Sequence, residues 1–151
     1  MRSDNRLSLA LHVLLHMSEH DGPATSEELG PRLGVNAVVL RRTLAGLREA
    51  GIVSSVKGHG GGWSIVRDLT QVTLGDVHRA IGSSALFGIG HRDEATACPI
   101  EQAVNRTITG ALHAATEVFE SALQSVAVAD LLEGGRKKFR EHAHSGGQSH
   151  A

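Results

Sequence analysis

The hydrophobic residues near the N-terminus of this 151-residue chain are spaced as in an amphipathic helix. From about Asn5 to His20, apolar residues recur every three or four positions, and Asp21-Gly22-Pro23 then ends the helix. A second helix should begin at Thr25, because a threonine followed three residues later by Glu28 forms a capping box. The apolar positions of the first helix are Leu7, Ala10, Leu11, Leu14 and Met17.

A short turn separates the second helix from a third. Gly34 should end the second helix, since glycine readily adopts the left-handed backbone that follows a helix. Asn36 then caps a helix that we expect to continue to Ala50. Leucines at steps of four and three residues predict the buried face of this third helix. They are Leu40, Leu44 and Leu47.

After Gly51 the pattern becomes typical of strands. Two β-prone segments, 52–56 and 63–67, flank a glycine-rich run at 57–62, which predicts a hairpin with a flexible tip. Thr73 should cap a short helix that follows the hairpin. This order of elements, three helices followed by a hairpin and a short helix, predicts a mainly α fold with a small β-hairpin wing. Such a fold is a winged helix-turn-helix.

A long helix of about 25 residues is predicted from Pro99 onward. It is too long to bury its apolar stripe against a domain of about 80 residues, so we expect an antiparallel helix of a second subunit to cover it. The stripe consists of Ile100, Val104, Ile108, Ala111, Ala115, Val118, Ala122 and Val126.

The sequence thus divides into four expected parts. Residues 1–82 form a winged helix-turn-helix DNA-binding domain, and 83–98 form a sensor loop. Residues 99–133 hold the dimerisation helix and a short terminal helix. The tail 134–151, charged and rich in glycine and histidine, is expected to be disordered.

Charge points to a local DNA-binding surface. The net charge of −1 and the pI near 6.8 exclude a globally basic protein, yet 36–67 carries five cations against one anion, a net charge of +4. Arginine forks can bind guanine O6 and N7 in the major groove. One Trp, three Phe and no Tyr leave few platforms for stacking unpaired bases, so duplex DNA is favoured. The outward face of the third helix holds Val38, Arg41, Arg42, Ala45 and Arg48.

The candidate contacts lie on the third helix and on the wing. Asn36 or Val38 could touch an adenine edge or a thymine methyl group, and Lys57 and His59 could reach the sugar-phosphate backbone. The alternatives are a solvated surface helix, a plain flexible turn, or a winged-helix protein-interaction module without DNA binding. Nucleotide binding is disfavoured, because no helix opens after the glycines.

Several motifs together resemble the Rrf2 family of bacterial transcription regulators over residues 5–133. The most specific of them is the glycine-rich wing followed by an aromatic residue. The matching segments are Ala50-Gly51-Ile52-Val53, Val56-Lys57-Gly58-His59-Gly60-Gly61-Gly62-Trp63, Val72-Thr73-Leu74-Gly75-Asp76-Val77, Ala97-Cys98-Pro99-Ile100 and Val128-Ala129-Asp130-Leu131-Leu132.

The resemblance implies a cytoplasmic homodimer that binds a palindromic operator and commonly represses, with the loop before the long helix as sensor. It maps the base contacts onto Asn36, Val38, Arg41 and Arg42. It maps the wing contacts onto Lys57 and His59.

The sensing chemistry of the family fits this chain poorly. Cluster-binding relatives usually have three loop cysteines, but Cys98 is the single cysteine here, and a [2Fe–2S] cluster needs about four ligands. Cys98 and His12 match positions of a mixed arrangement across a dimer, while Ser8 and Leu33 stand where other ligands would be expected. The single cysteine disfavours a [2Fe–2S] cluster without excluding it, so we expect no cofactor and regard Cys98 and His12 as weak metal candidates. Cys98 is either an inert small residue or a redox-sensitive thiol.

Two further features limit the function. His12, His16 and His20 repeat every four residues, a spacing compatible with metal binding, but a solvent-facing ridge is the favoured interpretation. No nucleophile lies near a base at a glycine turn, so catalysis is not expected. A single cysteine indicates a reducing cytoplasmic setting, and the N-terminal apolar run is too short to span a membrane.

Overall fold

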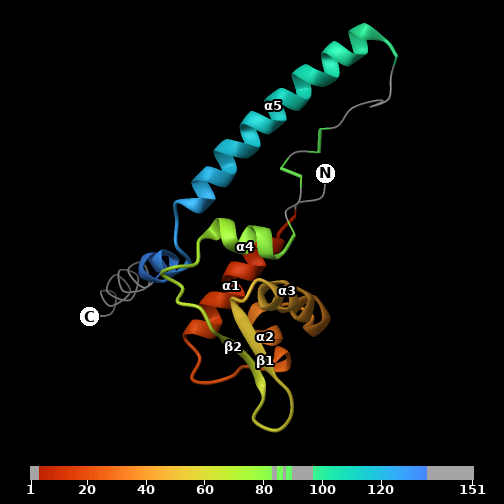
Figure 1. Ribbon diagram of the computed structural model, residues 1–151. Coiled ribbons are helices and arrows are strands. Elements are labelled where there is room, and N and C mark those ends of the chain that lie inside the picture. Colours follow the sequence, from red (N-terminus) through yellow and green to blue (C-terminus); the bar gives the residue numbers. More distant parts are fainter. Residues whose placement is uncertain (1–3, 83–84, 87, 90–96, 136–151) are drawn as a thin grey trace, which may run out of the picture.

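The computed structural model describes residues 4–82, 85–86, 88–89 and 97–135. It is mainly helical, with one two-stranded antiparallel hairpin and a long helix that projects from the rest of the molecule (Figure 1). The fold class expected from the sequence is therefore confirmed. The elements are α1 (Arg6–Ser18), α2 (Ser26–Leu33), α3 (Ala37–Glu49), β1 (Val53–Val56), β2 (Gly62–Ile65), α4 (Leu74–Ala80) and α5 (Pro99–Gln124).

The core is built mainly from α1 and α3, and the other elements of the winged domain and the segment after α5 add buried residues to it. Leu40, Leu44 and Leu47 of α3 are fully buried, as predicted. On α1 the helix is shorter than expected, and Val13 lies in the core while Leu7 and Leu11 are only partly buried. Position 13 falls within the narrow arc of the helix that also holds the other buried residues, at about 100° per residue. Those residues are Ala10, Leu14 and Met17.

The local signals around α2 are observed as predicted. The Glu28 N–H donates to Thr25 Oγ1 over 3.2 Å, and the Thr25 N–H donates to Glu28 Oε2 over 2.8 Å, which completes the capping box. Gly34 ends the helix with a φ of 65°. Asn36 Oδ1 then accepts the N–H of Val38 over 2.7 Å and caps α3. These bonds fix the angle at which α3 leaves the turn.

The hairpin is joined to the helices by an additional bridge. Strand β1 pairs with β2 so that Ser55 lies opposite Trp63. Trp63 also pairs with Ala24, through an Ala24 N–H to Trp63 O bond of 3.0 Å and a Trp63 N–H to Ala24 O bond of 2.9 Å. The segment before α2 therefore acts as a third, one-residue strand, which the sequence pattern did not reveal.

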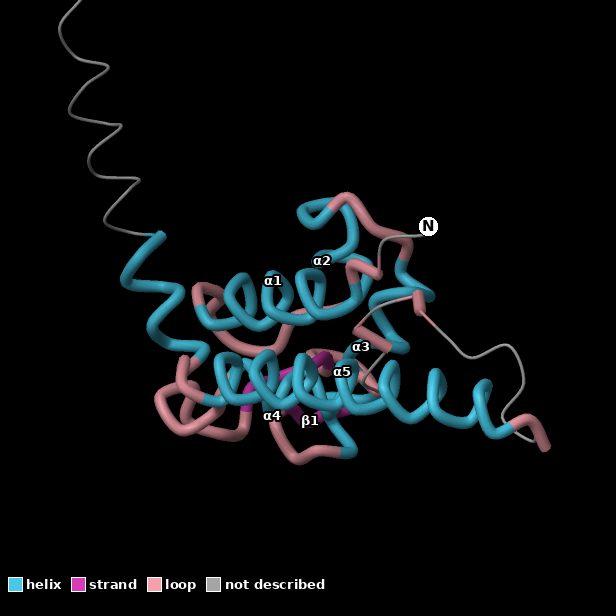
Figure 2. The backbone as a smooth tube through the Cα atoms, turned by 90° about the horizontal axis from the view of Figure 1, so that it is seen from above, coloured by secondary structure: helices cyan, strands magenta, loops and turns pink. Residues whose placement is uncertain are grey.

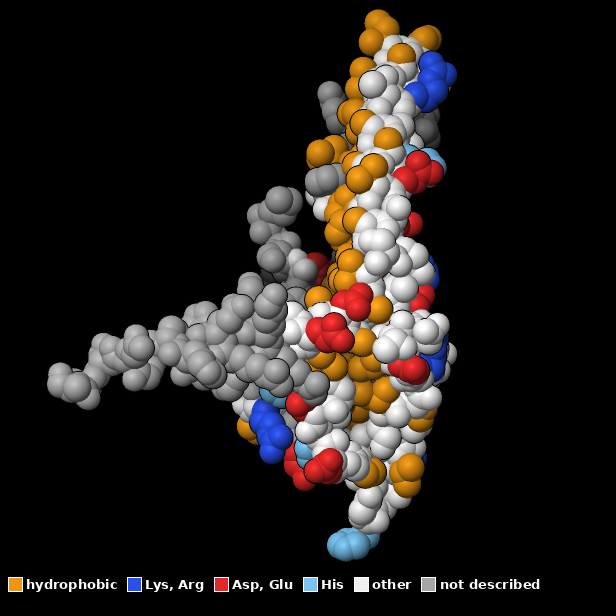
Figure 3. Space-filling view, turned by 90° about the vertical axis from the view of Figure 1, so that its left-hand side faces the viewer, with side chains coloured by type: hydrophobic (Ala, Val, Ile, Leu, Met, Phe, Trp, Pro, Cys, Tyr) orange, Lys and Arg blue, Asp and Glu red, His pale blue; other side chains and the backbone are white. Residues whose placement is uncertain are grey.

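Helix α5 runs alongside α4 at its C-terminal end and extends well beyond the winged domain (Figure 2). None of its 26 residues is buried. Hydrophobic side chains follow the helix in a nearly continuous line (Figure 3). Ile100 is 77% exposed and Val118 is 72% exposed.

The chain returns to the winged domain after α5. Val126, expected to continue the stripe, lies beyond the end of the helix, and its carbonyl accepts the N–H of Leu74 over 2.9 Å. That part of the prediction was wrong, because this backbone bond holds Val126 beside α4. Val128 is fully buried, and its N–H donates to Val72 O over 2.8 Å. Residues 128–135 are helical.

Two of the predicted parts, the sensor loop and the tail, lie largely or wholly outside the residues that the structure describes. The expected sensor loop 83–98 is described only at 85–86, 88–89 and 97–98, and the tail from 136 onward lies outside the described residues. The division into four parts therefore stays a prediction.

Candidate nucleic-acid interface

The outward face of α3 has the orientation that the leucine pattern predicts. Val38, Arg41 and Arg42 are exposed on it, with Val38 at 52%. Within the described part of the chain, Arg42 makes no ion pair or hydrogen bond. A guanidinium that is exposed and unengaged is available to an external partner, whereas the leucines hold the helix in place from the other side.

Arg41 has an intramolecular partner. Its guanidinium forms an ion pair with Glu27 of α2, and the two side chains are 53% and 63% exposed. Glu27 lies outside the segment 36–67, so the local charge of +4 did not include it. The pair lowers the positive charge of the surface and holds Arg41 across the turn between α2 and α3.

Asn36 has a structural role at the same place. Its Oδ1 accepts the cap hydrogen bond from Val38. A contact from Asn36 to a base would therefore come from Nδ2, which is a donor. The cap explains the residue type without any DNA contact, so its predicted base contact remains a prediction.

The wing tip presents Lys57 and His59, both exposed. Its glycines are required by the hairpin itself. Gly60 has a φ of 72°, which favours glycine. A Cβ on Gly61 would lie 2.3 Å from the carbonyl oxygen of Val56. The turn is therefore a defined backbone conformation that carries a cation and an imidazole.

Trp63 connects the wing to both helices of the helix-turn-helix. Its indole N–H donates to Ser26 Oγ of α2 over 3.2 Å. The Arg48 guanidinium of α3 lies 5.7 Å from the centre of the indole, within cation–π range, and it donates to Ser55 Oγ over 3.4 Å. Arg48 is exposed, but its contacts orient the wing relative to α3. The aromatic residue was recognised in the motif, while these partners were not.

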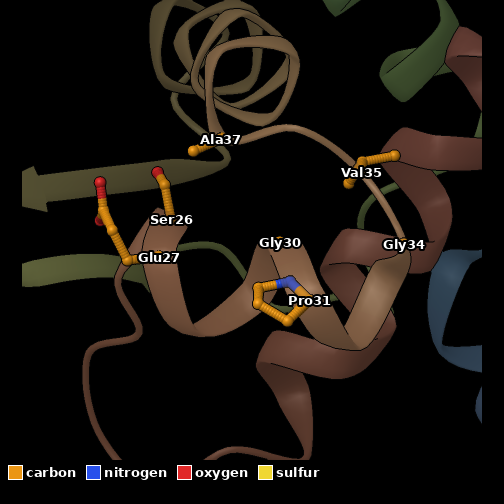
Figure 4. Close-up of a pocket in the computed structure, with 7 residues that line it drawn as sticks. All are labelled: Ser26, Glu27, Gly30, Pro31, Gly34, Val35 and Ala37. Atoms are coloured by element: carbon orange, nitrogen blue, oxygen red, sulfur yellow. The ribbon is translucent and has the colours of Figure 1, made fainter.

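A shallow hollow of about 370 Å³ lies between α2 and the start of α3 (Figure 4). Glu27 is the one ionisable side chain in its lining, so the lining holds no acid–base pair. The lining residues are Ser26, Glu27, Gly30, Pro31, Gly34, Val35 and Ala37.

The metal candidates do not come together within one chain. Cys98 is the exposed N-cap of α5, at the end of that helix remote from α1, which carries His12 (Figure 1). Among the residues that the structure describes, no three potential ligands form a group. An iron–sulfur cluster held by one chain would need about four ligands, and the sequence supplies a single cysteine.

Of the three histidines in the predicted ridge, two contact each other and the third lies near a backbone carbonyl. His12 Nε2 and His16 Nε2 lie 3.0 Å apart. The His20 ring instead lies 3.3 Å from the carbonyl oxygen of Gly22. Burial, then the charge of His12 and that of Arg32, lower the pKa of His16.

Comparison with known proteins identifies the family. The model of the Rrf2 family, described as an iron-dependent transcriptional regulator, matches residues 3–134. The chain belongs to the Rrf2 family. It is 28% identical over 138 residues to the HTH-type transcriptional regulator IscR of Yersinia pseudotuberculosis. The aligned region covers 87% of this chain and 79% of IscR.

Two further matches cover most of the chain. It is 26% identical over 129 residues to YwnA of Bacillus subtilis, covering 85% of this chain and 96% of YwnA. A solved structure from Lactobacillus plantarum superposes with a TM-score of 0.77 at 24% identity, covering 94% of this chain and 98% of that one. At that identity, the structural match shows the fold alone.

Family membership decides the general function. The protein is an Rrf2-type transcriptional regulator, its partner is DNA, and it is not an enzyme. An interaction module without DNA binding is not favoured. Of the helices that the structure describes, none combines the length and the hydrophobicity that a transmembrane span requires.

Proposed function

We propose that the protein is a homodimeric, sequence-specific repressor that places α3 in the major groove and the wing along the phosphate backbone. The observation that carries the proposal is the exposed face of α3. Its Arg42 is unengaged within the described chain, while the leucines of the opposite face are fully buried. Buried anchors on one side and a free guanidinium on the other suit a helix that reads an external surface.

The contact roles follow from side-chain chemistry. Arg42, and Arg41 when released from Glu27, would bind guanine bidentately, and Val38 would meet a thymine methyl group. Asn36 would donate to a base from Nδ2. Lys57 would contact phosphates, which position the protein without carrying sequence information.

His59 is the second wing contact. Its ring is exposed at the tip, where it would lie against the sugar-phosphate backbone or the minor groove.

Homodimerisation is supported by the uncovered stripe of α5. A second copy of the same helix, packed antiparallel, would cover apolar side chains such as Ile100 and Val118, which are now mostly in solvent. Two subunits related by a twofold axis would bind a palindrome with half-sites about 34–36 Å apart.

A charge placed on the stripe tests the dimer. Val118→Glu should shift the protein from dimer to monomer in sedimentation velocity, because it would bury a carboxylate in an apolar interface. His113→Glu is the matched control, since position 113 lies roughly 140° around the helix from position 118 and is exposed. A monomeric wild-type protein, or equal effects of both variants, would exclude this interface.

Selection of bound fragments from random duplex DNA tests the function itself. We expect enrichment of one twofold-symmetric sequence and binding that weakens steeply with salt, as phosphate contacts release counterions. DNA binding that depends on neither the DNA sequence nor the salt concentration would instead indicate a protein-docking module.

The finer sensing role rests on Cys98, which is exposed at the N-terminus of α5. Peroxide would oxidise the exposed Cys98 thiol of each subunit to a sulfenic acid, with release of one water molecule per thiol. We expect peroxide to weaken DNA binding by the wild type but not by Cys98→Ser. Equal loss in both proteins would remove Cys98 from sensing.

A further inference from the structure

Two imidazole rings meet on the outer side of α1. The Nε2 atoms of His12 and His16 lie 3.0 Å apart, and the ring centres lie 4.7 Å apart. Residues four apart on a helix are neighbours on one face, so the pair forms without any distortion of the backbone. His12 is exposed and His16 is half-buried. The two nitrogens are thus held close together at a surface that solvent reaches.

Their separation suits a shared cation. Imidazole nitrogen binds Zn²⁺ at about 2.0–2.1 Å, which places two nitrogens about 3.3 Å apart in a tetrahedral site and about 2.9 Å apart at a right angle. The observed 3.0 Å lies between these values. A hydrogen bond would need one ring to donate, whereas a metal accepts the lone pairs of both neutral rings.

We infer that His12 and His16 form a two-histidine site for a divalent transition-metal cation such as Zn²⁺ or Ni²⁺, with water in the remaining positions. Histidines at i and i+4 on one helical face are a known zinc-binding arrangement. The site needs neither Cys98 nor a second subunit, so it is separate from the sensing proposal.

The surroundings set the expected strength and form of binding. The lowered pKa of His16, caused first by burial, favours the neutral ring that metals require. The charge of Arg32 also acts on His16 and opposes a cation. We therefore expect weaker binding than in a four-ligand structural site, with one ion per chain.

Thermal unfolding of the metal-stripped full chain, with and without Zn²⁺ or Ni²⁺, tests the site. An ion that binds only the folded helix raises the midpoint temperature. Because linked binding groups gain about 10²–10⁴-fold in apparent affinity, His12→Gln and His16→Gln should each weaken binding by about a hundredfold. His20→Gln is the matched control on the same ridge, and it should retain the shift.

Further controls test whether the metal binds elsewhere on the chain. A variant with His142, His144 and His150 all changed to Gln should bind like the wild type. Mg²⁺, which prefers oxygen ligands, should give no shift. The inference is overturned if Zn²⁺ or Ni²⁺ does not raise the midpoint temperature of the wild type. It is also overturned if His12→Gln keeps this rise, or if Cys98→Ser loses it. His12 is exposed, so its variant provides the test even if His16→Gln fails to fold.

Discussion

Trp63 should couple the wing to α2 through one hydrogen bond whose energy can be isolated. Its indole N–H donates to Ser26 Oγ over 3.2 Å, and Ser26 is only 3% exposed. Trp63→Phe keeps an aromatic ring beside Arg48 but removes the donor. Leaving a buried polar group without its partner costs about 1–3 kcal/mol, so we expect the free energy of unfolding to fall by about 2 kcal/mol.

A double-mutant cycle with Ser26→Ala measures the bond itself. Ser26→Ala removes the acceptor and leaves the half-buried indole N–H unpaired, while the double variant removes both groups. The double variant should therefore cost about 0.5–1.5 kcal/mol less than the sum of the two single variants, the usual net value of a hydrogen bond. Urea unfolding at constant m-value is the assay. Additive costs would show that Trp63 does not hold the wing in this way.

Two other predictions concern charged side chains. Glu27→Gln should release Arg41 and raise DNA affinity in fluorescence anisotropy, at a stability cost of at most about 1 kcal/mol because the pair is exposed; unchanged or weaker DNA binding would contradict this. The hydrogen bond from the Thr73 N–H, acting against burial, holds the pKa of Asp76 below its ordinary value. The resulting stability is present above the unfolded pKa of about 3.9 and is lost as the pH falls through the lower folded pKa. Urea unfolding between pH 2 and 6 should show this loss, and Asp76→Asn should reduce it; an equally steep loss in that variant would exclude Asp76 as its source.

Local signals in the sequence were sufficient for most elements. The capping box at Thr25 and Glu28, the left-handed Gly34 and the Asn36 cap each involve residues within a few positions of one another. Such interactions depend on the local backbone, so their sequence patterns predict them well. The buried leucines of α3 followed in the same way from helical spacing.

Long-range choices of partner were not predictable from the pattern. Trp63 contacts Ala24, Ser26 and Arg48, and no periodicity relates these positions. Val128 packs into the core because the chain reverses after α5, although the apolar stripe appeared to continue through Val126. Spacing can assign a residue to a face, but the tertiary fold decides what it contacts.

The candidate site shows the same division. The exposure of Arg41 and Arg42 followed from the leucines opposite them, but the ion pair between Arg41 and Glu27 did not. The glycine-rich run of the wing was interpreted as a flexible hairpin tip. At Gly61 the structure shows why a glycine is needed, because a Cβ there would collide with the carbonyl oxygen of Val56 in the same hairpin.

Arg42→Ala tests the central claim, that the outward face of α3 reads DNA. Binding to the selected operator and to random duplex should be measured by fluorescence anisotropy over a range of salt, with Arg106→Ala on α5 as the control for loss of one exposed arginine. We predict that Arg42→Ala loses about 1–3 kcal/mol on the operator and less on random DNA, while Arg106→Ala binds like the wild type. Operator binding by Arg42→Ala equal to that of the wild type, or an equal loss in Arg106→Ala, would contradict the account.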